Sequence, residues 1–142
     1  MTPMKTIKTI FTFLAFTTLF SCSSDDDSHQ PTVAELLTSG KWYFESMTIA
    51  PLNDCGKNTF IQFFENGNAY TETYSLDGAG ECVLSQVNSG TYELISDTQL
   101  STTTAGETNS SLVIVQISET QLILRDESGS THNTITLDKT QG

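Results

Sequence analysis

Alternation of apolar and polar side chains is the dominant pattern of the chain after residue 40. A period of two is typical of strands that bury one face and leave the other in water. Turn signals such as Asp77-Gly78 and Ser89-Gly90 separate the alternating segments. The expected strands are residues 41–49, 59–65, 68–75, 81–87, 91–95, 99–103, 111–118, 121–126 and 132–138. Their regular spacing predicts an antiparallel sandwich or barrel.

Asn66-Gly67 is the sharpest of the turn signals. It predicts a hairpin with a two-residue type I′ turn, in which both central residues need a positive φ.

The alternation also predicts which side chains face the interior. In the first strand, Tyr43 and Glu45 take the outer face, and the apolar phase of each strand forms one buried wall. The expected inward residues are Trp42, Phe44, Ile61, Phe63, Tyr92, Leu94, Val113, Val115, Ile117, Leu122, Leu124, Ile135 and Leu137.

One short helix is expected before the strands. Thr32 and Glu35 stand three residues apart, which is the pattern of a capping box. Gly40 stands where such a helix would end, after an apolar stripe at helical spacing formed by Val33, Leu36 and Leu37. With only one or two turns, this helix would close part of the structure rather than form a layer of it.

Residues 1–21 are expected to be a signal peptide. Lys5 and Lys8 precede an apolar stretch over residues 9–20, which is shorter than the roughly 20 residues that a membrane span needs. Leu19-Phe20-Ser21-Cys22 resembles a bacterial lipobox, so we expect cleavage before Cys22 and its acylation, which anchors a protein to a bilayer. The alternative is an ordinary signal peptide and a Cys22 that forms a disulfide.

Residues 22–31 are polar and include three consecutive aspartates at 25–27, as expected for a flexible tether. The acidic run resembles the export tag of surface-exposed lipoproteins of Bacteroidota, and a plain solvated linker is the alternative. The predicted location is the outer membrane, on the cell surface if the run is such a tag. Residues 32–142 then form the folded domain.

The charge of the chain argues against nucleic acid as a partner. There are 6 Lys and Arg against 17 Asp and Glu, for a net charge of −11 at pH 7. Cleavage before Cys22 would remove Lys5 and Lys8 but no acid, which leaves −13. Nucleic acid is not an expected partner, because phosphate binding needs clustered basic residues.

Two further cysteines, Cys55 and Cys82, complete the set of three. In an exported protein such a pair is most simply one disulfide. The alternative is a free redox thiol, which no Cys-x-x-Cys spacing favours.

Several short motifs, in order along residues 36–137, resemble those of the small lipocalin-like lipoproteins of Bacteroidota. They are the Gly-x-Trp start Gly40-Lys41-Trp42, the hairpin Phe63-Phe64-Glu65-Asn66-Gly67, the strand Gly90-Thr91-Tyr92-Glu93-Leu94 and the late turn within residues 117–124. The resemblance implies an up-and-down β-barrel of about eight strands with a short N-terminal helix. We expect the protein to be a monomer. It also places a disulfide at Cys55 and Cys82.

The resemblance further implies that the barrel binds a small hydrophobic molecule. The candidate ligand-lining residues are ten of the inward ones, namely Phe44, Ile61, Phe63, Tyr92, Leu94, Val113, Val115, Ile117, Leu122 and Leu124. In this family an arginine often covers the Gly-x-Trp indole by a cation–π contact, a role that would fall to Arg125. The alternative is a solvent-facing Arg125, because Leu122 and Leu124 set the inward phase.

Catalysis, metal binding and cofactor binding have no support in the sequence. His29 and His132 stand in no spacing typical of a triad or a metal site. Asp126 and Glu127 would point to opposite faces of a strand, so they do not form an acid–base pair.

Two functions therefore stay open: a binding module with a ligand in the barrel, or a non-catalytic interaction protein with a filled core and an acidic surface. An eight-stranded barrel is just wide enough for either.

Overall fold

The computed structural model describes residues 29–104 and 110–142. The expected signal peptide, Cys22 and the acidic run at 25–27 lie outside the described residues. In the part of the chain that is described, no helix is long and apolar enough to cross a membrane.

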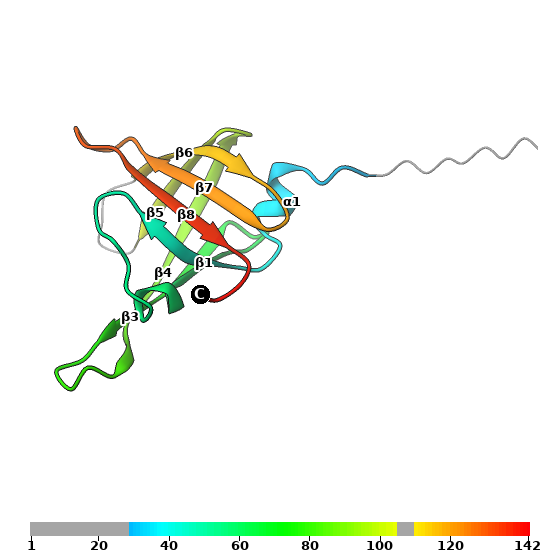
Figure 1. Cartoon of the computed structure of the whole chain (residues 1–142). Coiled ribbons are helices and arrows are strands. Elements are labelled where there is room, and N and C mark those ends of the chain that lie inside the picture. Colours follow the sequence, from blue (N-terminus) through cyan, green and yellow to red (C-terminus); the bar gives the residue numbers. More distant parts are fainter. Residues whose placement is uncertain (1–28, 105–109) are drawn as a thin grey trace, which may run out of the picture.

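Eight antiparallel strands form a closed barrel, in which each strand pairs with its sequence neighbours and β8 pairs with β1 (Figure 1). The strands are β1 (Lys41–Met47), β2 (Phe60–Phe63), β3 (Asn68–Leu76), β4 (Cys82–Ser96), β5 (Gln99–Thr104), β6 (Ser110–Ile117), β7 (Gln121–Asp126) and β8 (Asn133–Asp138). This confirms the predicted all-β, up-and-down barrel.

The N-terminal helix α1 (Val33–Leu37) lies at one end of the barrel (Figure 1). Its predicted capping box is present: the Thr32 hydroxyl accepts from the Glu35 backbone N–H, and the Glu35 carboxylate accepts from the Thr32 N–H at 2.7 Å. The chain then turns into β1 at Gly40, whose φ of 130° favours glycine. A 3-10 turn, η1 (Gly56–Asn58), follows β1.

Two expected strands, 81–87 and 91–95, are one continuous strand, so the predicted turn at Ser89-Gly90 is wrong. Both residues stay in the ladder, where Ser89 pairs with Tyr70 and Gly90 pairs with Ala69. Instead of forming a turn, Gly90 lets β4 and β5 approach each other closely, because a Cβ there would collide with the carbonyl oxygen of Thr103 on β5.

The hairpin expected at Asn66-Gly67 joins β2 to β3, but its turn is not type I′. Gly67 has a φ of 81°, and no non-glycine residue in the described ranges has a positive φ. The Gly67 N–H donates to the Phe64 carbonyl at 3.0 Å, and the Phe64 N–H donates to the Asn68 carbonyl at 2.9 Å. A longer loop with a single left-handed glycine therefore replaces the two-residue turn.

The apolar phase of most strands faces the interior as predicted. The largest fully buried side chains belong to Trp42, Phe63, Leu37, Leu100, Leu122 and Leu137. Phe44, Ile61, Tyr92, Leu94, Ile117 and Ile135 are partly buried against this core.

The prediction was wrong for β6, where Leu112 and Ile114 take the inward positions expected for Val113 and Val115. Ile114 is 5% exposed and pairs with Leu124, whereas Val115 is 51% exposed. The register shifts between Ile114 and Gln116, which is a β-bulge. The extra residue changes the phase, so that Ile117 faces inward again.

The β3–β4 hairpin extends away from the barrel (Figure 1). Beyond Glu72, the last β3 residue paired with β2, the two strands pair only with each other. Its exposed apolar side chains are Leu76, Val83, Leu84 and Val87.

Candidate binding site

The barrel is closed at the α1 end by Trp42. Its indole N–H donates to the carbonyl oxygen of Leu37 at 2.9 Å, which ties the start of β1 to the end of the helix. Lys139 covers the ring, with its Nζ atom 3.4 Å from the ring centroid. The Gly-x-Trp segment is therefore a structural closure of the barrel.

The cation implied for this position was Arg125, and that implication is wrong. Arg125 lies off the inward phase, as its alternative prediction stated, and its Nε donates to Glu127 at 2.6 Å. Lys139 has the role instead because it continues the inward phase of Leu137 just past the end of β8. The alternation that puts Leu137 inside also puts Lys139 inside. The sequence prediction missed Lys139 because it followed the alternation only to the end of the strand.

Burial lowers the pKa of Lys139 from 10.5 to about 8. The Nζ atom is buried and has no hydrogen-bond partner in the described structure. The electron-rich face of Trp42 is thus the group that it contacts in place of water.

The interior next to this closure is filled. Among the predicted ligand-lining residues, Phe63, Leu122 and Leu124 are at most 3% exposed and belong to the packed core. Phe63 contacts Tyr92 edge-on, with ring centroids 5.0 Å apart. No room for a ligand is left around these side chains, and whether any predicted lining residue touches a ligand stays a prediction.

A small cavity of about 90 Å³ lies farther along the barrel interior. On β5, Leu100 belongs to the core, whereas Thr102 and Thr104 line the cavity. Ile61 is the one predicted ligand-lining residue at its wall, and the other wall residues include Ala69, Thr71, Asn88 and Leu112. We call this space the mouth cavity.

The sequence prediction missed the threonines of the mouth cavity because it sought apolar residues. Thr102 and Thr104 nevertheless continue the inward phase set by Leu100, and Thr71 continues the phase of Ala69. An inward face that changes from leucine to threonine along the strand was the available signal.

The wall of the mouth cavity carries no charged side chain. Threonine hydroxyls and the Asn88 amide can donate and accept hydrogen bonds, and Ile61 and Leu112 offer apolar surface. Such a mixture suits a neutral group with a polar atom.

The disulfide predicted between Cys55 and Cys82 is present, with the two Cα atoms 5.4 Å apart. It ties the segment before η1 to the start of β4, next to the loop of the projecting hairpin, where Cys82 pairs with Leu76.

Within the described ranges, no three His, Cys, Asp or Glu residues form a group that could hold a metal ion. His29 contacts the Glu35 carboxylate at 3.0 Å, and His132 lies 3.6 Å from that of Glu127. Both contacts are on exposed side chains.

Comparison with known proteins agrees with this architecture. A family model described as a lipocalin-like domain matches residues 38–124. The chain belongs to this lipocalin-like family. No curated protein matches the sequence.

Two solved structures share the fold. A lipocalin-like protein from Bacteroides uniformis is 14% identical with a TM-score of 0.53, over 73% of this chain and 99% of that one. Lobster apocrustacyanin A1 is 12% identical with a TM-score of 0.50, over 78% of this chain and 69% of that one. At these identities the likeness concerns the fold alone.

Proposed function

We propose that this protein is a monomeric lipoprotein of the outer membrane, anchored through acylated Cys22, that binds a small neutral molecule at the mouth cavity. The observation that carries the proposal is the change of the barrel interior from packed leucines to a threonine-lined cavity. The membership in a lipocalin-like family supports it.

The size of the mouth cavity limits the ligand. At about 90 Å³, it is well below the roughly 300–1,000 Å³ of pockets that enclose drug-sized ligands. The ligand would therefore insert a small end group, such as one ring, and leave its remainder outside the cavity. The uncharged wall and the net charge of −13 that remains after cleavage before Cys22 favour a neutral molecule over an anion.

Titration of the purified protein with N-phenyl-1-naphthylamine, a neutral fluorophore, tests this function. We expect saturable binding at one site, lost in Thr102→Phe, which fills the cavity. Ser101→Phe is the matched control, because Ser101 is the neighbouring β5 residue and does not line the cavity. Equal binding in both variants would place the fluorophore elsewhere and contradict the proposal.

Cell fractionation tests the anchor separately. The short apolar stretch and the lipobox-like Leu19-Phe20-Ser21-Cys22 support acylation. Cys22→Ala is expected to move the protein from the membrane to the soluble fraction. Retention in the outer membrane would contradict the lipoprotein proposal, whatever the fluorophore does.

A monomer is expected because the closed wall of the barrel offers no free edge strand for pairing with a second copy, and the unpaired edges of the projecting β3–β4 hairpin are short. Light scattering of the detergent-solubilised protein, corrected for detergent, measures this directly. A dimer mass would contradict it.

An interaction protein is the second candidate, favoured by the projecting β3–β4 hairpin. Its exposed Leu76, Val83, Leu84 and Val87 have no cover in the described structure. Residues 58–124 include no Lys or Arg, so a partner with an apolar groove and a basic rim would be complementary. Cross-linking in intact cells tests it: Leu84→Ser should abolish one cross-linked species that Ile95→Ser retains. Ile95 is also exposed, at 56% against 49% for Leu84, but it lies on another hairpin.

A further inference from the structure

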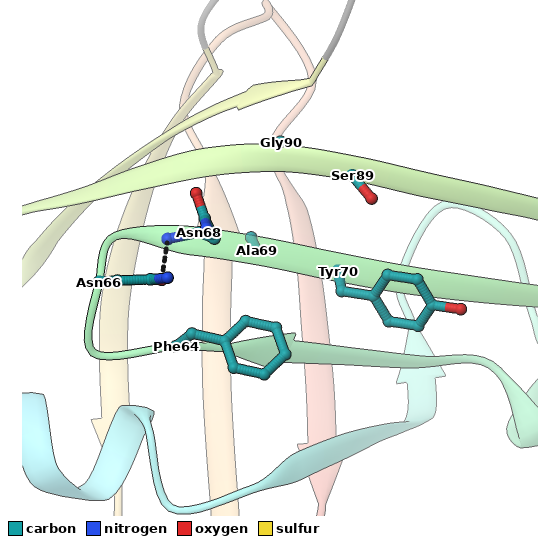
Figure 2. Close-up of a pocket in the computed structure, with 7 residues that line it drawn as sticks. All are labelled: Phe64, Asn66, Asn68, Ala69, Tyr70, Ser89 and Gly90. Atoms are coloured by element: carbon teal, nitrogen blue, oxygen red, sulfur yellow. Dashed lines mark hydrogen bonds between the residues drawn. The ribbon is translucent and has the colours of Figure 1, made fainter.

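A second pocket lies on the outer face of the barrel, where β2, β3 and β4 run side by side. It has a volume of about 440 Å³, and its walls are Phe64, Asn66, Asn68, Ala69, Tyr70, Ser89 and Gly90 (Figure 2). We call it the outer pocket. The backbone of β3 and β4 separates it from the mouth cavity, whose walls also include Ala69, Ser89 and Gly90.

Two aromatic rings form the apolar part of the outer pocket. Figure 2 shows the Phe64 ring just after β2 and the Tyr70 ring on β3, with the asparagines at the turn end and Ser89 on β4. Phe64 is 38% exposed, so part of its ring is open to solvent.

The Phe64 backbone and the Tyr70 ring are held in place before any ligand arrives. The Phe64 carbonyl accepts from the Tyr92 hydroxyl at 2.9 Å, and the Phe64 N–H donates to Asn68. The Tyr70 hydroxyl donates to Glu72 at 2.7 Å, and its ring packs against Phe60 at 6.0 Å between centroids. A ligand that stacks on the held Tyr70 ring loses little affinity to ordering it.

Hydrogen-bonding groups around the rings are free. In the described structure, the Asn68 amide and the Ser89 hydroxyl have no hydrogen-bond partner. The Asn66 side chain uses only its oxygen, which accepts from the Asn68 N–H at 3.1 Å. Two amides and a hydroxyl therefore face the solvent beside the exposed Phe64 ring and the half-buried Tyr70 ring.

The charges around the outer pocket disfavour an anion. No residue of its wall is charged, and the nearby Glu65 and Glu72 are acidic. The strand cation Lys41 is held over the Phe60 ring, with its Nζ atom 3.7 Å from the centroid. Polar binding must therefore come from neutral amide and hydroxyl groups.

From this combination we infer that the outer pocket binds a neutral carbohydrate, with a pyranose ring stacked on Phe64 and Tyr70. One face of such a ring carries axial C–H groups, which pack on the negative face of an aromatic ring. Its equatorial hydroxyls each donate and accept, as do the amides of Asn66 and Asn68. The site is open to solvent on one side, so a chain of sugars can extend past it.

A glycan array that holds neutral and anionic oligosaccharides, followed by calorimetry with the tightest neutral binder, tests the inference. We expect binding of a neutral oligosaccharide that weakens about tenfold, or about 1.4 kcal/mol, in each of Phe64→Ala and Tyr70→Ala. Tyr74→Ala is the matched control, because Tyr74 donates to the same Glu72 at 2.9 Å and does not line the pocket. Far-UV circular dichroism verifies that each variant is folded.

A further variant addresses the amides without removing a ring. Asn68→Ala should weaken binding while the melting temperature stays that of the wild type, because the Asn68 side chain makes no hydrogen bond within the described residues. Three results would each overturn the inference. The first is a preference for anionic or quaternary ammonium ligands. The second is that no neutral oligosaccharide binds the wild type more tightly than it binds the Phe64→Ala variant, and the third is equal affinity in all variants. These results are separate from binding of the fluorophore, which Thr102→Phe reports.

Discussion

The Nζ atom of Lys139 lies 3.4 Å from the centroid of the Trp42 ring, at the closed end of the barrel. Burial favours the neutral amine and lowers its pKa to about 8, whereas the ring face attracts the ammonium form. The same pair links the first strand to the residue that follows the last strand. It therefore holds the two ends of the sheet together where the barrel closes.

Titration of Lys139 should be visible in the fluorescence of Trp42, the only tryptophan. We expect a change with a midpoint near pH 8, absent in Lys139→Met. A midpoint at or above the ordinary lysine pKa would show that attraction to the ring outweighs burial. Lys57→Met is the control, because its hydrogen bond to Glu45 raises the pKa of Lys57 and keeps it out of this range.

The same shift sets a pH dependence of stability. Between a folded pKa of about 8 and an unfolded pKa of 10.5, the unfolded state binds more protons at Lys139. The contribution of this group to the free energy of unfolding therefore rises with pH across that window. Urea unfolding at pH 7.5 and 9.5 measures this. The free energy of unfolding should rise more between the two pH values for the wild type than for Lys139→Met, and equal rises would contradict the lowered pKa of Lys139.

Loss of the Cys55–Cys82 disulfide should lower stability without changing the fold. The cysteines are 27 positions apart, and closing such a loop stabilises by about 3–4 kcal/mol in the chain-entropy estimate. The double variant Cys55→Ser, Cys82→Ser should unfold at lower urea with an unchanged far-UV spectrum, because every strand keeps its ladder partners. A loss below about 1 kcal/mol, compared with this expectation, would show that other contacts already order the loop.

The barrel could be predicted from the sequence because its strands alternate over long segments and its turns contain glycine. Where alternation is ambiguous, the prediction was wrong. Leu112, Val113, Ile114 and Val115 form a continuous apolar run, so either phase looks buried. Pairing with Leu100 and Leu124 selects Leu112 and Ile114, and those partners are known only once the barrel closes.

The candidate sites were harder to predict from the sequence than the fold, for a related reason. The predicted ligand-lining residues were apolar, but in a barrel this narrow such side chains fill the interior. The mouth cavity depends on Thr71 and Thr102, which are polar and come from strands far apart in sequence. Lys139 was missed because inward phase was followed only within strands.

The phase of β6 can be tested with two adjacent residues. Ile114→Ala removes buried methyl groups and should cost about 2–5 kcal/mol of unfolding free energy. Val115→Ala changes a side chain that is 51% exposed, so its cost should stay below about 1 kcal/mol. Chemical denaturation measures both, and a larger loss at Val115 would restore the sequence-based phase.

Gly90 offers the last test, because it lines both the mouth cavity and the outer pocket. A Cβ at this position would collide with the carbonyl oxygen of Thr103. Gly90→Ala should therefore separate β4 from β5 locally, at a cost of about 1–3 kcal/mol, the usual range for overpacking. Ser89→Ala is the control, because Ser89 is exposed and its substitution by alanine introduces no new atom.

Hydrogen exchange locates the effect of Gly90→Ala. Faster exchange is expected at the amides of the Thr91–Thr103 and Gly90–Thr104 pairs, which lie at the point of collision. Exchange in β7 and β8 should stay unchanged, because these strands lie across the barrel from the substitution. Unchanged exchange at Thr91 and Thr103, together with wild-type stability, would mean that β5 gives way without cost and that Gly90 is not needed for the continuity of β4.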